Sequence, residues 1–487
     1  MRLCELNFRK SFEKLGEGFF AKCKPVALDK SKVVAVSKEA ADLIGLDIDE
    51  LWSENFSEFI LGKIKNEKYS YLAQVYAGHQ FGNFVDVLGD GRALLLAEIE
   101  NQKNEKWDLV LKGCGITPYS RTYIRSSDGR AALRSSIREF LISESLYHLN
   151  IPTSRALCLV ASDEVIVREK LEKAAQVVRI APSHIRFGTF EFFFYRKEND
   201  KVKILADYII EEHFSEIKNS DNKYASFLLK VVESTAKMIA KWQAFGFCHG
   251  VMNTDNMSIH GISFDFGPFG FLDNYNPNHI CNSTDVSGRY SFINQPFIGF
   301  WNLNAFAITL SSLISIEEQK EILGKYENFF LDEYHNLMSA KLGFENCDLE
   351  VQNLIYELLE ILEKSELDYT NFFVGLSNVL KMENYREFFV NLGTEWFKFG
   401  EKYLELLIKK DISDNLRLSV MNRNNPKFIL RNYLLQRAII KAENNDYSEI
   451  QVLQKLMKNP FEIDEVYKSY YEATPKNERA KPLSCSS

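Results

Sequence analysis

The segment 249–267 contains the residues whose types and spacing are best suited to chemistry. Asn256 and Asp265 lie nine positions apart, and residues 257–264 between them have the pattern of a short β-hairpin. A hairpin of this length would return the chain and bring both oxygen-bearing side chains to one hard cation such as Mg²⁺. Asn and Asp are also common in turns, so turn chemistry explains the pair equally well when it is taken alone.

Other parts of the chain follow the order seen in protein kinases. A glycine turn between two predicted strands comes first, then a lysine ending the next strand, a helix bearing a glutamate, and an Asn…Asp-Phe-Gly loop. In kinases the glycine loop covers phosphates, the lysine pairs with the helix glutamate, and the Asn and Asp hold metal ions. The corresponding residues here are Gly89, Gly91, Lys112, Glu139, Asn256 and Asp265.

Three features depart from the kinase pattern. The kinase base would lie five residues before Asn256, but Val251 stands there and cannot accept a proton; Asp255 is the nearest carboxylate. Asp90 places an acid in the glycine loop, where it would repel a γ-phosphate held in the usual way. Two arginines at 179 and 186 lie in an apolar run and suit phosphate oxygens. Together these features predict an ATP site arranged unlike that of a kinase.

Hydrophobic periodicity predicts the elements that position these residues. Strands are expected at 85–88 and 93–97 around the glycines, at 107–111 and 156–167, and in a β-rich run at 175–195. A helix is expected from about 129 to 147, with Asp128 as its N-cap. Beyond 205 the chain is predicted to be mostly helical, apart from loops at 249–296. A β-rich first half and a helical second half predict an α+β, two-lobed arrangement.

Composition limits the classes of function. The 487 residues are 46% hydrophobic and 26% charged, which indicates a folded globular protein. Lys and Arg number 59 against 67 Asp and Glu, a net charge of −8, so we expect no nucleic-acid partner. The uncharged stretch 297–316 is interrupted by polar residues, which favours a buried helix over a membrane span. No secretory signal or CxxC pair is visible, so we expect a cytoplasmic monomer.

Several strings of the sequence closely resemble the selenoprotein O family, and the match runs from about residue 70 to the last residues. These strings occupy residues 89–92, 111–113, 117–121, 128–131, 133–140, 179–188, 249–256, 265–271 and 425–427. The resemblance implies a protein-kinase-like fold with a β-rich N-lobe and a helical C-lobe, in which ATP binds in a flipped orientation. It implies transfer of AMP to Ser, Thr or Tyr hydroxyls of proteins, with ATP as substrate and Mg²⁺ or Mn²⁺ as cofactor.

The resemblance also implies a role for each matching residue. The implied nucleotide-binding residues are Gly89, Gly91, Arg92, Lys112, Asp128, Gly129, Glu139, Arg179, Arg186 and Asp265. Among them, Lys112 would contact phosphates with Glu139 as its partner, and the two arginines would hold the inverted γ-phosphate. Asp255 would be the proton acceptor, and Asn256 and Asp265 the metal ligands. The family more often has Tyr where Phe266 stands here.

The C-terminal tail carries a further implication of the resemblance. Bacterial relatives can form a disulfide between a tail cysteine and one in the activation segment, and the matching residues are Cys485 and Cys281. Such a bridge would make activity depend on redox state; two unrelated free thiols are the alternative. We expect an N-terminal extension at 1–75, an N-lobe at 76–200, a C-lobe at 201–420 and a helical region with a redox-active tail at 421–487.

Two other functions stay open at this point. A phosphotransferase acting on a protein or a small molecule could use Asp255 as its base. A non-catalytic ATP-binding scaffold could instead sense redox state through its tail thiol. The sequence also leaves open whether UMP can replace AMP.

Overall fold

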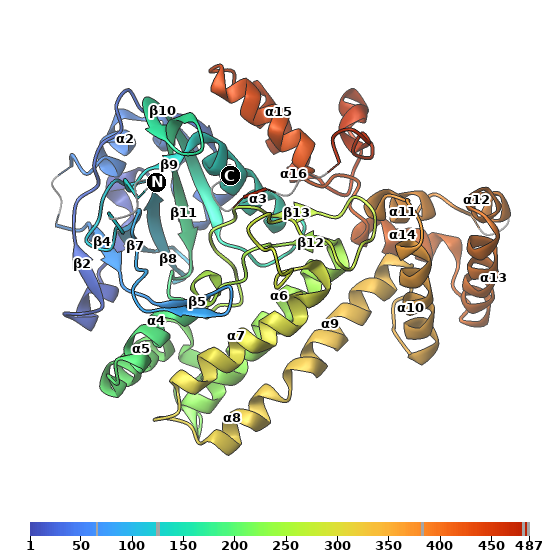
Figure 1. Ribbon diagram of the computed structural model, residues 1–487, viewed down its shortest axis with the longest axis horizontal. Helices are drawn as coiled ribbons and strands as arrows, with labels where there is room; N and C mark the ends of the chain where they lie inside the picture. The colour runs from blue at the N-terminus through green and yellow to red at the C-terminus, as the bar shows by residue number, and fades with distance from the viewer. Residues whose placement is uncertain (65–66, 123–126, 381–383, 480–482, 485–487) are drawn as a thin grey trace.

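The computed structural model describes the chain except for residues 65–66, 123–126, 381–383, 480–482 and 485–487. All strands of the large sheet lie within the first 181 residues, and helices form most of the remainder (Figure 1). The chain therefore has the mixed composition of sheet and helices that its periodicity predicts. The sheet packs at one end of the molecule and the long helices extend away from it (Figure 1).

The large sheet has nine strands, and neighbouring strands pair antiparallel. Its main path runs in the order β2 (Phe20–Lys22), β4 (Leu72–Gln74), β7 (Ala93–Glu100), β8 (Lys106–Lys112), β11 (Leu171–Ala181), β10 (Arg155–Val167) and β3 (Lys32–Val36). Off this path, β1 (Asn7–Arg9) pairs with β7, and β9 (Ala131–Ala132) pairs with β11. The first 75 residues thus supply strands to the same sheet as the site residues.

Both faces of this sheet are buried, which explains why its strands are almost continuously apolar. Successive residues of a strand point to opposite faces. Leu95 and Val110 enter the core that also contains α3 (Leu133–His148). Leu94 and Leu109 enter a second core that is closed by α1 (Lys38–Leu43) and α2 (Glu54–Ile60). The N-terminal helices therefore cover the sheet face opposite α3.

The predicted strand–glycine turn–strand unit is wrong in its pairing. The strand before the glycines is β6 (Asn83–Val85), and it pairs with β5 (Gly78–Gln80) in a separate two-stranded hairpin. The partner of β7 across the glycines is β4. Residues 75–92 therefore form a long excursion between two paired strands, and strand pairing at this distance has no signal in local periodicity.

Two further boundaries differ from the sequence prediction. The helix expected from 129 begins at Leu133, because Ala131 and Ala132 pair with β11, and Asp128 is not its N-cap. The β-rich run expected at 175–195 ends at Ala181 and is followed by the helix α4 (Phe187–Tyr195). Three of its phenylalanines, at 187, 190 and 193, are spaced to bury one helical face, and that packing overrides the β-propensity of an aromatic run.

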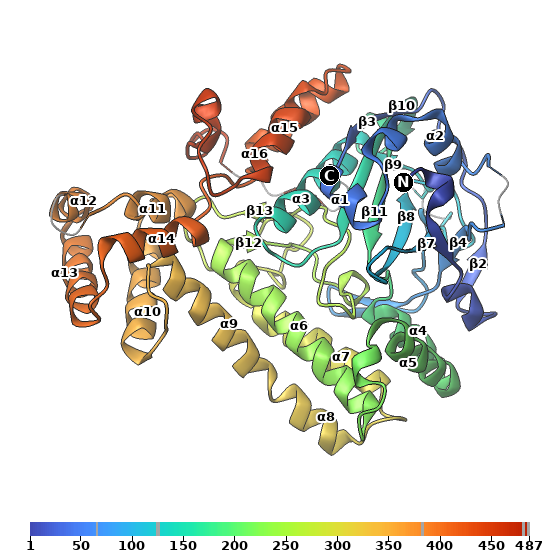
Figure 2. The ribbon, with the colours of Figure 1, turned by 180° about the vertical axis from the view of Figure 1, so that it is seen from behind.

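Most of the second part of the chain is helical. The elements are α5 (Asn199–His213), α6 (Lys223–Phe245), α7 (Gln295–Thr309), α8 (Ile316–Leu323), α9 (Tyr326–Lys341), α10 (Leu349–Glu363), α11 (Tyr369–Leu376), α12 (Tyr385–Leu392), α13 (Thr394–Lys409), α14 (Asp414–Asn424), α15 (Asn432–Glu443) and α16 (Ser448–Lys458). Helices α6, α7 and α9 lie side by side in both views (Figures 1 and 2). Helices α15 and α16 return to pack against α3.

The uncharged stretch at 297–316 is divided between two helices, because α7 ends at Thr309 and α8 begins at Ile316. Ile298, Leu303 and Phe306 of α7 are buried, whereas Phe297 is 63% exposed. The helix therefore has one core-facing side, as expected of a packed helix in a globular protein. Across the described ranges of the chain, none of the helices combines the length and apolar character needed to cross a membrane.

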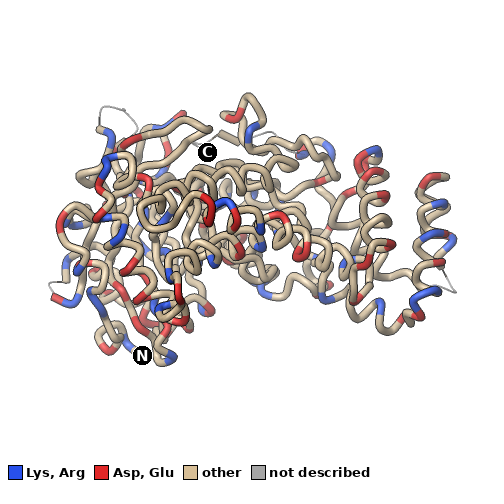
Figure 3. The backbone as a smooth tube through the Cα atoms, turned by 90° about the horizontal axis from the view of Figure 1, so that it is seen from below, with Lys and Arg blue, Asp and Glu red and all other residues tan. Residues whose placement is uncertain are grey.

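Charged residues of both signs are distributed over the whole backbone (Figure 3). Segments of Lys and Arg alternate with segments of Asp and Glu, in keeping with the small net charge of −8. An anion would therefore be bound by a local group of cations rather than by a basic face.

Candidate active site

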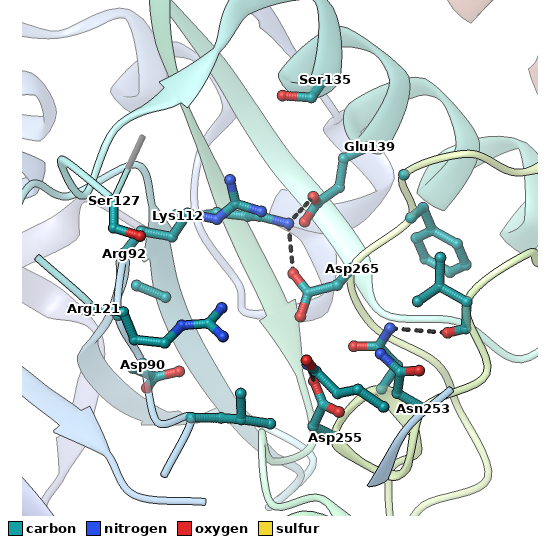
Figure 4. A pocket seen from close by; sticks show the side chains of 18 of the residues that line it. Asp90, Arg92, Lys112, Arg121, Ser127, Ser135, Glu139, Asn253, Asp255 and Asp265 are labelled. Atoms are coloured by element: carbon teal, nitrogen blue, oxygen red, sulfur yellow. Dashed lines mark hydrogen bonds and ion pairs between the residues drawn. The ribbon is translucent and has the colours of Figure 1, made fainter. Parts of the chain in front are cut away.

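A cavity of about 680 Å³ lies between the sheet and the loop that follows β12 (Phe247–Cys248). The predicted site residues that line it are Gly89, Gly91, Arg92, Lys112, Gly129, Glu139, Arg179, Asp255, Asn256 and Asp265. Asp128 and Arg186 stand behind this wall, in contact with residues that line it. Figure 4 shows Lys112, Glu139 and Asp265 directed toward one another, with Arg121 and Asp90 on the opposite side of the cavity.

The strand register explains why Lys112 and Arg179 meet. Lys112 ends β8 opposite Val177 of β11, and Arg179 lies opposite Val110. Residues two apart on a strand share a face, so both cations lie on the side of the sheet that α3 covers. Diagonal neighbours on adjacent strands are close enough for long side chains to interact.

Glu139 of α3 lies between these two cations. Its Oε2 accepts a hydrogen bond from Lys112 Nζ, and its Oε1 accepts one from Arg179 Nη1 at 3.2 Å. The glutamate is 3% exposed. Burial of a carboxylate is costly unless it is paired, and here two cations compensate it.

Asp265 joins the same cluster from the loop side. Its Oδ1 accepts hydrogen bonds from Lys112 and from Arg179 Nη1, the latter at 2.9 Å, and its Oδ2 lies 3.3 Å from Arg186 Nη1. Burial raises the pKa of Asp265, but the three cations outweigh it and hold the pKa well below its usual range. The backbone φ of Asp265 is +59°, an uncommon value for a residue with a side chain.

The loop that carries Asn256 and Asp265 returns on itself, as its sequence predicts. Met257 pairs with Ser263 in an isolated bridge, and Phe264 N donates to Asn256 O at 3.2 Å. β12 and β13 (Gly270–Phe271) pair on either side of the loop and close its base. Asn256 Nδ2 donates to Val251 O at 2.9 Å, which leaves its amide oxygen available on the cavity wall.

Asp255 lies beside Asn256 and is 8% exposed. Arg186 Nη1 donates to its backbone oxygen at 2.8 Å, and Gln80 Nε2 donates to its Oδ2 at 3.3 Å. Burial raises the pKa of the Asp255 carboxyl to about 7; Arg186 and Gln80 lower it, and Asp265 raises it further. A carboxyl group near neutrality is suited to accept a proton.

The glycine loop is held by the segment that follows β8. Gly89 has a φ of +61°, and a Cβ there would lie 2.6 Å from the Tyr119 ring, so glycine is required. Thr117 Oγ1 donates to Asp90 O at 2.6 Å. The Asp90 carboxylate turns back to accept from Gln74 N at 2.9 Å, and burial raises its pKa to about 6. The Asp90 carboxylate therefore joins the glycine loop to the end of β4.

Asp128 and Gly129 lie at the edge of the cavity. Both carboxylate oxygens of Asp128 accept from Arg168, at 2.7 and 2.9 Å. Gly129 has a φ of +73°, and a Cβ there would lie 2.0 Å from the carbonyl carbon of Gly115. Gly129 thus allows two backbone segments to meet beside the cavity, and Arg168 rather than Asp128 contributes to its wall.

Cys281 is a buried free thiol, and Cys485 lies outside the described residues. Cys281 Sγ is 3.4 Å from Cys248 Sγ. The C-terminal tail reaches the same place, because Leu483 N donates to Cys281 O at 3.0 Å and Ser283 N donates to Leu483 O at 2.8 Å.

Several residues of the cavity wall lie outside every motif that the sequence indicates. They include Tyr76, Gln80, Ser127 and Arg168, whereas Arg121, Ser135 and Asn253 lie within matching strings but have no role predicted for them. Gln80 meets Asp255 across 175 residues of chain, a separation at which no periodicity or motif rule applies.

The chain matches known proteins over nearly its whole length. The family model described as "Protein adenylyltransferase SelO" matches residues 2–459. A "Protein nucleotidyltransferase YdiU" of Pseudomonas fluorescens (strain Pf0-1) is 45% identical over 489 residues, covering 100% of this chain and 99% of the relative. Relatives of the same description from Pseudomonas putida (strain GB-1) and Ectopseudomonas mendocina (strain ymp) are 42% and 41% identical, covering 100% of this chain and 99% and 100% of their own lengths.

These matches identify the protein's class as that of the nucleotidyltransferases. The chain belongs to the protein adenylyltransferase SelO family, and the resemblance to selenoprotein O that its motifs indicate is confirmed.

Proposed function

We propose that the protein transfers AMP from ATP to Ser, Thr or Tyr hydroxyls of other proteins, with release of pyrophosphate. One observation carries this proposal: Lys112, Arg179 and Arg186 converge on the single carboxylate of Asp265 at the cavity wall. Glu139 also pairs with Lys112 and Arg179, so three cations face two carboxylates there, and the excess positive charge suits a polyphosphate. The proposal also takes the two parts of the molecule as the N-lobe and C-lobe of a kinase-like fold.

The nucleotide would bind between the glycine loop and the cation cluster. Gly89, Gly91 and Arg92 would contact it from the sheet side, and Gly129 from the edge of the cavity. Asp128 would act through Arg168, which it holds at the cavity wall. Lys112 and Arg179 would stabilise the growing negative charge of pyrophosphate as it leaves, with Arg186 reinforcing them from behind Asp265. Glu139 would keep Lys112 oriented.

Asp255 would accept the proton of the attacking hydroxyl. The hydroxyl oxygen forms a bond to the α-phosphorus, the bond from that phosphorus to the bridging oxygen of pyrophosphate breaks, and the proton passes to the Asp255 carboxylate. Asp255 lines the same cavity as Lys112 and Arg179, so the proposed base and the two cations face the same space. A base must lie within hydrogen-bonding reach of the proton that it takes.

Asn256 and Asp265 would hold the divalent cation, Mg²⁺ or Mn²⁺. Their donor set fits such an ion, because the Asn256 nitrogen is occupied by Val251 O while its oxygen is available, and Asp265 offers a carboxylate. When bound, the ion would neutralise phosphate charge. The same pair of oxygen ligands serves either metal, so both ions are expected to support activity.

The test uses purified protein, a protein acceptor mixture, Mg²⁺ or Mn²⁺, and ATP labelled separately at the α- and γ-phosphates. We expect label to enter protein from the α-position only, with pyrophosphate released. Label from the γ-position would identify a phosphotransferase, and label from neither position with ATP bound would favour a scaffold. Parallel reactions with labelled UTP establish whether UMP is transferred.

We further propose that a Cys281–Cys485 disulfide regulates this activity. The pairing of Leu483 with the backbone beside Cys281 supports it, because Cys485 is two residues farther along the chain. Mass spectrometry of the oxidised protein under non-reducing conditions is expected to find the linked peptides. Cys485→Ser is expected to remove the effect of dithiothreitol on AMP transfer, whereas the exposed Cys4→Ser control keeps it. An unchanged redox response in Cys485→Ser would contradict the proposal.

A further inference from the structure

The β5–β6 hairpin packs directly against the residues around Asp255. Ala77 N donates to Gly188 O at 2.9 Å, which anchors the start of the hairpin to α4. His79 N donates to Thr254 Oγ1 at 2.7 Å. The hairpin leads into the glycine loop, so one excursion of the chain contacts both the proposed base and the proposed nucleotide site.

A buried carboxylate braces this contact. Glu191 of α4 is 0% exposed, and it accepts hydrogen bonds from Thr254 Oγ1 and pairs with His79 Nδ1. On the other side, Tyr290 Oη donates to Asn253 Oδ1 at 2.7 Å. The backbone on the N-terminal side of Asp255 is therefore held by α4, by the hairpin and by the segment after Cys281.

The two oxygens of the Asp255 carboxylate differ in their surroundings. Oδ1 is buried without a hydrogen-bond partner among the described residues, and a Cβ on Gly78 would lie 2.9 Å from it. Oδ2 accepts from Gln80 Nε2 at 3.3 Å, and both side chains line the cavity. Oδ2 is therefore the oxygen that an acceptor hydroxyl can reach.

We propose that Gln80 is a positioning residue that sets the rotation of the Asp255 carboxylate, so that a lone pair of Oδ2 faces the acceptor hydroxyl. The torsion of an aspartate carboxylate is broad, and a single donor is enough to select one orientation. Gly78 contributes by leaving space for Oδ1, where any side chain would push the carboxylate toward the cavity. The inference rests on the proposed AMP transfer, because it assigns Asp255 the role of proton acceptor.

The experiment compares three variants with a matched control. Gln80→Met keeps the length but has no donor, Gln80→Glu replaces the donor with a like charge, and Gly78→Ala crowds Oδ1. The control is Asn83→Met, because Asn83 lies opposite Gln80 in the hairpin and is exposed. For each protein, kcat and KM for α-labelled AMP transfer, the Kd of ATP and the Tm are measured.

We expect Gln80→Met to lower kcat roughly 10- to 100-fold, because a misplaced base loses alignment with its proton. The KM and Kd of ATP are expected to stay within about twofold, because the hydrogen bond between Gln80 and Asp255 is not one of the contacts proposed to bind ATP. Gln80→Glu and Gly78→Ala are expected to show the same split, and Asn83→Met to match wild type. A wild-type kcat in Gln80→Met would overturn the inference, as would parallel losses of kcat, ATP affinity and Tm.

A crystal structure of Gln80→Met separates this inference from the proposed function. We expect the Asp255 carboxylate to rotate relative to the wild-type structure, whichever phosphate the enzyme transfers. An unchanged carboxylate would overturn the positioning role even if AMP transfer is observed. Absence of α-label transfer by the wild-type protein would contradict the proposed function alone.

Discussion

Asp265 balances three cations that would otherwise repel one another. Lys112, Arg179 and Arg186 all contact its carboxylate, and Glu139 compensates only the first two. Removal of one partner from a buried ion cluster is costly because the remaining charges stay buried. A polyphosphate in the cavity would offer the same compensation, so Asp265 and the nucleotide are expected to compete in part for the same cations.

This competition predicts the behaviour of Asp265→Ala. Without nucleotide, the variant is expected to lose about 3–5 kcal/mol of stability, because three cations lose a shared anion. In EDTA it is expected to bind ATP at least as tightly as wild type, since the freed cations can contact phosphate. Calorimetry and isothermal titration measure both quantities. The control Asp86→Ala removes a carboxylate that is 67% exposed, and weaker ATP binding only in Asp265→Ala would contradict the argument.

Lys341 is a second residue whose buried charge lowers the stability of the folded protein. It is buried at the end of α9, with its ammonium 4.2 Å from the centre of the Phe373 ring. Burial, with a smaller contribution from Lys427, lowers the pKa of Lys341 to about 7 from 10.5. Below pH 7 the amine is protonated in both the folded and the unfolded states, and the full penalty for burying its charge applies.

Lys341→Met is therefore expected to stabilise the protein by about 1–3 kcal/mol at pH 7, because a buried charge gives way to an apolar side chain. The gain should shrink as the pH rises toward 10.5, because the unfolded chain then also loses its proton. Denaturant unfolding at pH 7 and pH 9 measures it. The exposed Lys402→Met serves as control, and a gain that grows with pH would contradict the assignment.

At the scale of elements, α3 connects the sheet to the loop that carries Asn256 and Asp265. Glu139 contacts Lys112, while the preceding residue, Arg138, donates to Gly267 O at 3.1 Å and to Phe269 O at 2.9 Å. Arg138 also donates to Asn432 Oδ1 of α15 at 3.2 Å. One turn of α3 therefore holds the cation cluster and the loop after Asp265, and the C-terminal helices support it from behind.

Arg138→Met is expected to weaken Mn²⁺ binding roughly tenfold, as the loss of a residue that orients a metal ligand typically does. Its loss removes two hydrogen bonds from the loop that follows Asp265. Electron paramagnetic resonance titration of Mn²⁺ measures the affinity directly. Arg134→Met, one turn earlier on α3 and paired with Glu172 of β11, is expected to bind Mn²⁺ normally. Equal losses in both variants would mean that the helix as a whole had been disturbed.

At the scale of the whole molecule, the sheet and the helical part meet at buried polar groups as well as at the cavity. His184 is 2% exposed; its backbone nitrogen donates to Asp108 of β8 at 2.9 Å, and its ring stacks on Phe264 at 5.1 Å. Burial, followed by the nearby Arg179 and Arg186, lowers the pKa of His184 well below 6.5. The folded structure therefore favours the neutral form of the imidazole at this junction.

The folded protein keeps His184 neutral while the unfolded chain protonates it below pH 6.5, so this residue reduces stability as the pH falls through that value. His184→Phe is expected to unfold with a shallower dependence of Tm on pH between about 6.5 and 4.5. Calorimetry of both proteins across this range measures the difference, in which the contributions of other groups cancel. A steeper slope in the variant would show that His184 is charged in the folded state.

The sequence by itself predicted those parts of the site that are formed within a single short segment of the chain. The return of the chain between Asn256 and Asp265 follows from a short apolar run between polar residues. Lys112 is expected to end its strand because the apolar run at 107–111 stops there, and it does end β8. The selenoprotein O motifs also predicted that residues from both halves of the chain form one site, because proteins that share such motifs share a fold.

Tertiary structure alone decided the pairings. Local periodicity cannot tell that β4 rather than β6 pairs with β7, because pairing depends on which apolar faces the whole sheet must bury. The helix α4 replaces a predicted strand because its phenylalanines fill a core supplied by distant helices. The contacts of Gln80 with Asp255 and of Arg138 with Gly267 join residues 175 and 129 positions apart, and only packing of the complete chain brings them together.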